Sequence, residues 1–170
     1  MLRRHFAVIV ALGLATLAVS YPVWSQEHDQ QALIKAMGDA KVSLQQGLTA
    51  SQREGRAISA KFEMEDGKLQ LSIYTEKGGK FSEVIVDHNN GSVAKSETIT
   101  DGDDLTHAKS QSTAMTKAKS QLKDAVDKAL SKAAGARALS ATAEMKGGRS
   151  VASIELLRGG QIQSVTEELD

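Results

Sequence analysis

The chain has 170 residues with 21 basic and 21 acidic side chains, so its formal net charge is zero, and it contains no cysteine. This balance excludes the electrostatic attraction to phosphate backbones on which nucleic-acid-binding proteins depend. The absence of cysteine excludes disulfide bonds and a thiol nucleophile, so a packed core must hold the fold together.

Residues 1–25 have the pattern of a secretory signal peptide. Two arginines precede an apolar run over residues 6–19, and small and polar residues follow it. The run is shorter than the roughly 20 apolar residues that cross a bilayer, so we expect no stable membrane anchor after cleavage. We expect cleavage after Ser25, with a cut after Ser20 as the weaker alternative. The mature protein is then periplasmic or secreted.

Residues 26–99 form the first of two predicted units, and this unit begins with helical periodicity. Apolar side chains recur at three- and four-residue steps over residues 33–48, as on one face of a helix. Two glycines, Gly47 among them, interrupt the stripe, and Ser43 is suited to cap a new helix. One kinked helix and two shorter helices fit this pattern equally well. Either arrangement ends near Gly55.

Strands follow the helical segment of the first unit. Apolar and polar residues alternate through the first of them, which is the period-two pattern of a strand with one solvated face. The pairs Asp66-Gly67 and Asn90-Gly91 and the two glycines at 78 and 79 mark hairpin turns. The predicted strands cover residues 58–65, 69–73 and 81–86, with a more polar fourth strand over 92–99.

Residues 100–111 lie between the two units. This segment begins with several aspartates and shows no apolar periodicity, so it is predicted to be a solvated, acidic linker.

Residues 112–170 form the second predicted unit. Apolar residues on one stripe predict a single helix over 113–134, and Gly135 can take the left-handed conformation that ends it. Three strands are predicted after the helix, over 137–145, 149–157 and 161–168. This unit lacks the terminal turn and the fourth strand of the first.

The two units share a repeated stretch of sequence. Arg56-Ala57-Ile58-Ser59-Ala60 returns as Arg137-Ala138-Leu139-Ser140-Ala141, at an offset of 137 − 56 = 81 residues. An offset of this size exceeds the 20 to 50 residues typical of solenoid repeats, so we interpret it as a small domain duplicated once. The predicted fold class is α+β, with two tandem repeats that each pack a helix on a three- to four-stranded antiparallel meander.

The core of the second unit is predicted to be thinner. Phe62 corresponds to Ala143, and Phe81 corresponds to Ile162. A missing buried phenylalanine costs about 3 to 5 kcal/mol where the site cannot collapse. We therefore expect the second unit to be the less stable one, so that residues 111–170 alone melt less cooperatively and at a lower temperature than the first unit alone.

The end of the first unit resembles the PepSY domain family, in which an apolar strand is followed by an aspartate, a short turn with glycine, and a valine. Val86, Asp87, Gly91 and Val93 match these positions. The second unit has the helix and earlier strands but lacks this terminal turn. The resemblance implies a small, non-catalytic, exported module. Related domains occur in the propeptides of secreted metallopeptidases, where a role in inhibition or folding is suspected, and as separate exported proteins.

No arrangement of residues in the sequence predicts catalysis, a cofactor or a metal. His28, His88 and His107 are far apart, and each is next to a predicted turn or linker. The aspartates of residues 101–104 lack the glutamate that an EF-hand places at its twelfth position, and hairpin geometry already explains the polar residues of 87–91. No G-x-S-x-G motif or phosphate-binding loop is present. The chain is therefore expected not to be an enzyme.

Three function classes are compatible with these observations. We favour a module that binds another exported protein, such as a peptidase that it inhibits or regulates, because the predicted second unit leaves a sheet edge unpaired. The alternative is a structural or self-associating protein of the cell envelope, and the sequence leaves the oligomeric state open. Carriage of a small ligand between helix and sheet is the third class, and no convergent polar group supports it.

Overall fold

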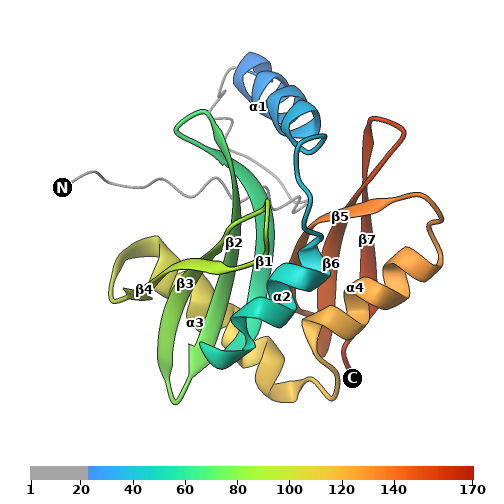
Figure 1. Cartoon of the computed structure of the whole chain (residues 1–170). Coiled ribbons are helices and arrows are strands. Elements are labelled where there is room, and N and C mark those ends of the chain that lie inside the picture. The colour runs from blue at the N-terminus through green and yellow to red at the C-terminus, as the bar shows by residue number, and fades with distance from the viewer. Residues whose placement is uncertain (1–22) are drawn as a thin grey trace.

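The computed structural model describes residues 23–170 of the chain (Figure 1). Residues 1–22 of the predicted signal peptide lie outside the described residues, while the predicted cleavage position falls within the first described helix. Among the helices of residues 23–170, none has the length and apolar character needed to cross a bilayer.

The secondary structure alternates pairs of helices with groups of strands. In chain order the elements are α1 (Val23–Ala36), α2 (Leu44–Ala50), the 3-10 turn η1 (Ser51–Arg53), β1 (Arg56–Glu65), β2 (Lys68–Lys77), β3 (Lys80–Val86), β4 (Val93–Ile99), α3 (Gly102–Lys117), α4 (Leu122–Ser131), β5 (Arg137–Lys146), β6 (Arg149–Arg158) and β7 (Gln161–Glu168).

All of these strands belong to one antiparallel sheet of seven strands in the order β4-β3-β2-β1-β5-β6-β7. The two predicted meanders are therefore joined side by side. The joint is between β1 and β5, where Ser59, Ala60 and Lys61 pair with Thr142, Ala141 and Ser140. The fold class α+β is confirmed, whereas the expectation of separate sheets is wrong. The alanines at the joint have no bulky side chains, so the two strands can pair closely there.

One face of the sheet is apolar. Register places one row of apolar residues across six strands: Val84, Ile73, Ala60, Ala141, Ile154 and Val165. The helices α2 and α4 cover this face (Figure 1). A Cβ atom on Gly47 of α2 would lie 2.7 Å from Cδ2 of Leu71, so only glycine lets this helix approach β2 so closely. What the sequence presents as a helix breaker is therefore a packing position.

The opposite face carries mostly polar residues. The row that crosses it is Glu97, Glu83, Tyr74, Ser59, Thr142, Ser153 and Thr166. Helix α3 runs behind the sheet on this side (Figure 1), where Ser59 Oγ and Gln111 Oε1 are 3.0 Å apart in a hydrogen bond. Helix α1 stands at the end of the sheet beside the hairpin of β1 and β2.

The segment predicted to be a linker is largely helical. Residues 102–111 of the predicted linker 100–111 form the first part of α3. Asp103 and Asp104 lie in its first turn, where acidic side chains interact favourably with the helix dipole. Leu105, Ala108 and Met115 give the helix an apolar side that is too sparse to stand out in the sequence.

The single helix predicted over residues 113–134 is also wrong, because the chain leaves the helical conformation at Ala118, where ψ is 142°. The N–H groups of Lys119 and Ser120 both donate to the carbonyl oxygen of Leu169, at 2.7 and 3.0 Å. Helix α4 then begins at Leu122, and the carboxylate of Asp124 accepts the N–H of Gln121 at 3.0 Å. A tertiary acceptor at the end of β7 thus interrupts a continuous apolar stripe.

The N-terminal helical segment is two helices, which settles the alternative that the sequence left open. Ser43 caps α2: its hydroxyl accepts the N–H of Gln46, while the side chain of Gln46 accepts the N–H of Ser43. In the loop before it, the N–H groups of Lys41 and Val42 both donate to the carbonyl oxygen of His88 at 3.0 Å.

Candidate functional site

The four residues of the PepSY-like motif lie together at the end of β3. Val86 is buried, Asp87 and Gly91 form the turn with the φ of Gly91 at 79°, and Val93 begins β4 with 39% of its surface exposed. The N–H of Gly91 donates to the carbonyl oxygen of Asp87 at 2.8 Å. This positive φ is the conformation that glycine adopts at no steric cost.

The carboxylate of Asp87 is occupied by its own turn. One oxygen accepts the backbone N–H of Asn89 at 2.8 Å and its side-chain amide at 3.1 Å, and the other accepts the amide of Asn90 at 2.8 Å. These hydrogen bonds, that from the backbone of Asn89 above all, lower the pKa of Asp87 below its ordinary value. With its acceptors used in this way, Asp87 shapes the turn. The motif is a structural anchor, because the next carbonyl, that of His88, holds the loop before α2.

Two arginines link the halves of the molecule. Arg56 at the start of β1 donates to the carbonyl oxygen of Met115 at 2.9 Å, at the end of α3. Arg137 at the start of β5 donates to the carbonyl oxygens of Met37 and Ala40 at 2.6 and 3.0 Å, just after α1. Each arginine therefore holds the end of a helix from the other half. Both open the repeated sequence motif, which singled them out without showing what they bind.

The outer side of β7 is the feature best suited to binding. This strand and β4 are the two edges of the described sheet. The N–H of Leu169 donates inward to the carbonyl oxygen of Ser150 at 3.0 Å, and the pairing of β6 with β7 has no register shift. Since inward and outward groups alternate along an antiparallel strand, the backbone groups of Ile162, Ser164 and Thr166 point to the open edge.

The same strand carries a buried carboxylate that sequence reasoning missed. Glu167, with 6% of its surface exposed, is on the apolar face beneath α4. Its oxygens pair separately with Lys128 Nζ at 3.0 Å and Lys132 Nζ at 2.5 Å. The hydrogen bond from Lys132 is the main cause that lowers the pKa of Glu167, followed by the contribution of Lys128. Lysines at an i, i+4 spacing on a helix were visible in the sequence, but their partner was not.

Polar residues of the opposite face bond to one another. The carboxylate of Glu63 pairs with Lys61 Nζ at 2.6 Å and accepts the hydroxyl of Ser72 at 2.7 Å. The hydroxyl of Tyr74 donates to Glu83 at 3.2 Å, and burial, followed by the charges of Glu83 and Glu63, raises the pKa of Tyr74 well above its ordinary value. This network stabilises the folded sheet and contains no nucleophile paired with a base.

The histidines considered as ligands are not brought together. His88 is in the turn after β3 and His107 is within α3, while nothing is described of the side chain of His28. Within residues 23–170 no group of three or more histidine, aspartate or glutamate side chains is arranged to hold a metal ion.

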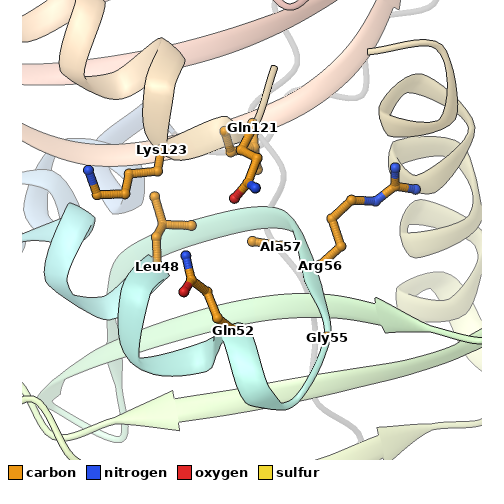
Figure 2. Close-up of a pocket in the computed structure, with 8 residues that line it drawn as sticks. Leu48, Gln52, Gly55, Arg56, Ala57, Gln121 and Lys123 are labelled. Atoms are coloured by element: carbon orange, nitrogen blue, oxygen red, sulfur yellow. The ribbon is translucent and has the colours of Figure 1, made fainter. Parts of the chain in front are cut away.

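A small cleft lies where η1 and the start of β1 approach the start of α4 (Figure 2). Its volume is about 30 Å³, and Leu48, Gln52, Arg56, Gln121 and Lys123 are among the residues that line it. Such a volume holds about one water molecule, far less than the roughly 300 to 1,000 Å³ of a ligand pocket. This cleft therefore does not support carriage of a small ligand.

Comparisons with known proteins add little to this geometry. No protein-family model matches the chain, and no curated protein matches it. Among solved structures, the chain is similar to the crystal structure of a "putative lipoprotein" from Clostridium difficile, with 12% sequence identity and a TM-score of 0.41. The similarity covers 71% of this chain and 79% of that chain. A likeness of this size carries no argument about function.

Proposed function

We propose that this chain is an exported, non-catalytic, duplicated module of the PepSY type that binds another exported protein at the edge of β7. An exported peptidase is the partner class that the family resemblance suggests. The N-terminal pattern of residues 1–25 supports export to the periplasm or the medium.

Matching backbone anchors support the duplication. Lys41 and Val42 donate to the carbonyl of His88, and Lys119 and Ser120 donate to that of Leu169. The carbonyls are 169 − 88 = 81 residues apart, as the strands are, and the donors are 119 − 41 = 78 residues apart. The difference of three residues equals the difference in length between α4, with 10 residues, and α2, with 7. Both halves thus place a helix pair, anchored on a strand end, before three hairpin-connected strands.

One observation carries the proposed binding site. Under the offset of 81 residues, β7 corresponds to β3, and β3 pairs along its outer side with β4. Within residues 23–170, no strand occupies the corresponding position beside β7. A strand with outward N–H and C=O groups is the template that β-strand addition uses, in which an extended segment of a partner supplies the missing strand.

A backbone block at the edge tests this proposal. A photo-crosslinking residue at exposed Gln163 is placed in the exported, full chain, in versions that also carry Ser164→Pro or Ser164→Ala. Proline removes an outward N–H and is tolerated on edge strands, whereas alanine keeps the donor. We expect partner capture to fall sharply with proline and to persist with alanine, with equal melting temperatures of the two variants. Equal capture by both variants would overturn the proposed site.

Self-association is the second candidate, because the same molecule also exposes an edge at β4. Edge-to-edge pairing of β4 with β7 of another copy would extend the sheet from molecule to molecule. Light scattering after size-exclusion chromatography distinguishes the two candidates: a monomer at high concentration removes self-association and leaves binding of a different protein.

A further inference from the structure

We infer that the segment added at β7 is an antiparallel strand with an acidic side chain directed at Lys128 and Lys132 of α4. This inference rests on the proposed strand addition and specifies the chemistry of the partner. The register of β4 on β3, the charges beside Glu167 and the exposure of the two lysines carry it.

The pairing of β4 with β3 provides a template for the register. Ile99, Glu97 and Lys95 of β4 lie opposite Phe81, Glu83 and Ile85 of β3. Moving this pairing by 81 residues places the same three kinds of position opposite Ile162, Ser164 and Thr166 of β7. A partner strand in this register puts an apolar side chain beside Ile162, which is half-buried. It runs antiparallel to β7, as β4 runs to β3.

The position opposite Glu167 differs between the halves. In the first half, buried Val86 lies opposite Val93 of β4. In the second half, Glu167 stands in place of Val86 and pairs with two lysines. The added strand therefore meets charges where β4 meets an apolar side chain.

The charge of this cluster favours an acidic residue. Lys128, Lys132 and Glu167 sum to one net positive charge, and both lysine side chains remain more than half exposed, at 53% and 59%. Each ammonium has three donors, and the oxygens of Glu167 use one on each lysine. A second carboxylate on the neighbouring strand can accept from the remaining donors. Such charge-assisted hydrogen bonds are stronger than neutral ones.

Two peptides test this inference with the full chain. One has the sequence of residues 92–99, and the other is the same peptide with Val93→Asp, which places a carboxylate opposite Glu167 in the template register. Amide shifts of β7 followed by NMR report binding to the edge. We expect the acidic peptide to bind about fivefold more tightly at low salt, and the difference to shrink at high salt, as for a partly exposed ion pair.

A variant of the protein sharpens the result. Glu167→Val introduces the residue found at the corresponding position of the first half and leaves both lysines without their partner. The preference for the acidic peptide should then increase, while binding of the unmodified peptide stays constant. Lys128→Gln should reduce the preference. Ser164→Ala, at the same edge but away from the lysines, should leave it unchanged.

The outcomes separate the two levels of the argument. Equal affinity for the two peptides, or a preference indifferent to Glu167→Val, would overturn the inference about charge and leave strand addition standing. Failure of both peptides to shift the amides of β7 would overturn the proposed function and this inference together.

Discussion

The two halves of the sheet end differently, although their strands are joined into one surface. The first half ends in β4, which the turn through Asp87 and Gly91 directs back along β3. The second half ends in β7, followed by Leu169, whose backbone bonds return the chain toward α4 and β6. The comparison teaches that the same anchor can either close an edge or leave it exposed, depending on the residues that follow it.

The first helices of the halves differ in the same way. Helix α3 runs across the polar face, whereas α1 stands at the end of the sheet (Figure 1). At the offset of 78 residues, Leu105 and Ala108 of α3 correspond to Glu27 and Gln30 in the sequence of α1. A helix with polar residues at these positions gains little by packing on a sheet. The shared arginine contacts at the ends of α1 and α3 therefore fix where each helix ends, and the sequence of the helix decides where the rest of it lies.

The largest expected effect concerns the core position that differs most between the halves. Phe62 is 3% exposed and its counterpart Ala143 is 1% exposed. Phe62→Ala should lower the free energy of unfolding by about 3 to 5 kcal/mol, because a cavity remains where the ring was. Urea denaturation followed by circular dichroism measures this loss. A loss below about 1 kcal/mol would show that the first half collapses as easily as a core built around alanine.

The reciprocal arginines give the next effect, and they should be unequal. Arg137→Ala removes hydrogen bonds to two carbonyls and should cost about 2 to 3 kcal/mol, since charged donors form the stronger hydrogen bonds. Arg56→Ala removes one carbonyl contact and a 3.7 Å pair with Glu76 at a side chain that is 40% exposed, so about 1 kcal/mol is expected. Thermal melts of both variants, with Arg→Lys controls, test this order. The reverse order would contradict the account of how the halves are linked.

The ion pairs at Glu167 should make stability depend on pH. The folded state lowers the pKa of this carboxyl, so its contribution is present above the ordinary value of about 4.3 and is lost as the pH falls below it. Glu167→Gln should cost about 1 to 2 kcal/mol at neutral pH and little in acid. Unfolding curves at several pH values measure the difference. A cost that stays constant with pH would assign it to packing rather than charge.

The smallest effect is expected at the cap of α2. Ser43→Ala removes the acceptor of the Gln46 N–H and should cost about 1 kcal/mol. Exposed Ser164, changed to alanine, serves as the control and should stay within about 0.5 kcal/mol of the original chain. Amide hydrogen exchange of α2 would locate the loss: it should accelerate there and stay constant in α4.

Local patterns predicted the strands well and the helices poorly. The alternation in residues 58–65 and the Asn90-Gly91 turn depend on neighbouring residues, so the sequence was sufficient for them. The break at Ala118 depends on the carbonyl of Leu169, which is 169 − 118 = 51 residues away in the chain. Periodicity within a short window contains no information about such an acceptor.

The candidate site could be predicted only in outline. The absence of a fourth strand in the second unit indicated an unpaired edge, and the structure places β7 there. The joint between β1 and β5 was missed, since alanine-rich strands carry no mark of their partner. The buried Glu167 was missed because only the register of β7 turns it toward α4. The lower stability of the second half stays a prediction.

The helix pairs of this molecule are tethered by main-chain oxygens, and that choice of atom affects how the sequence can change. Histidine and leucine have little in common as side chains, yet at positions 88 and 169 each presents the same carbonyl to two consecutive amides. Substitution at these points can therefore proceed without altering the arrangement of the elements. Relatives of this chain should accordingly keep its geometry long after ordinary sequence alignment has ceased to detect them.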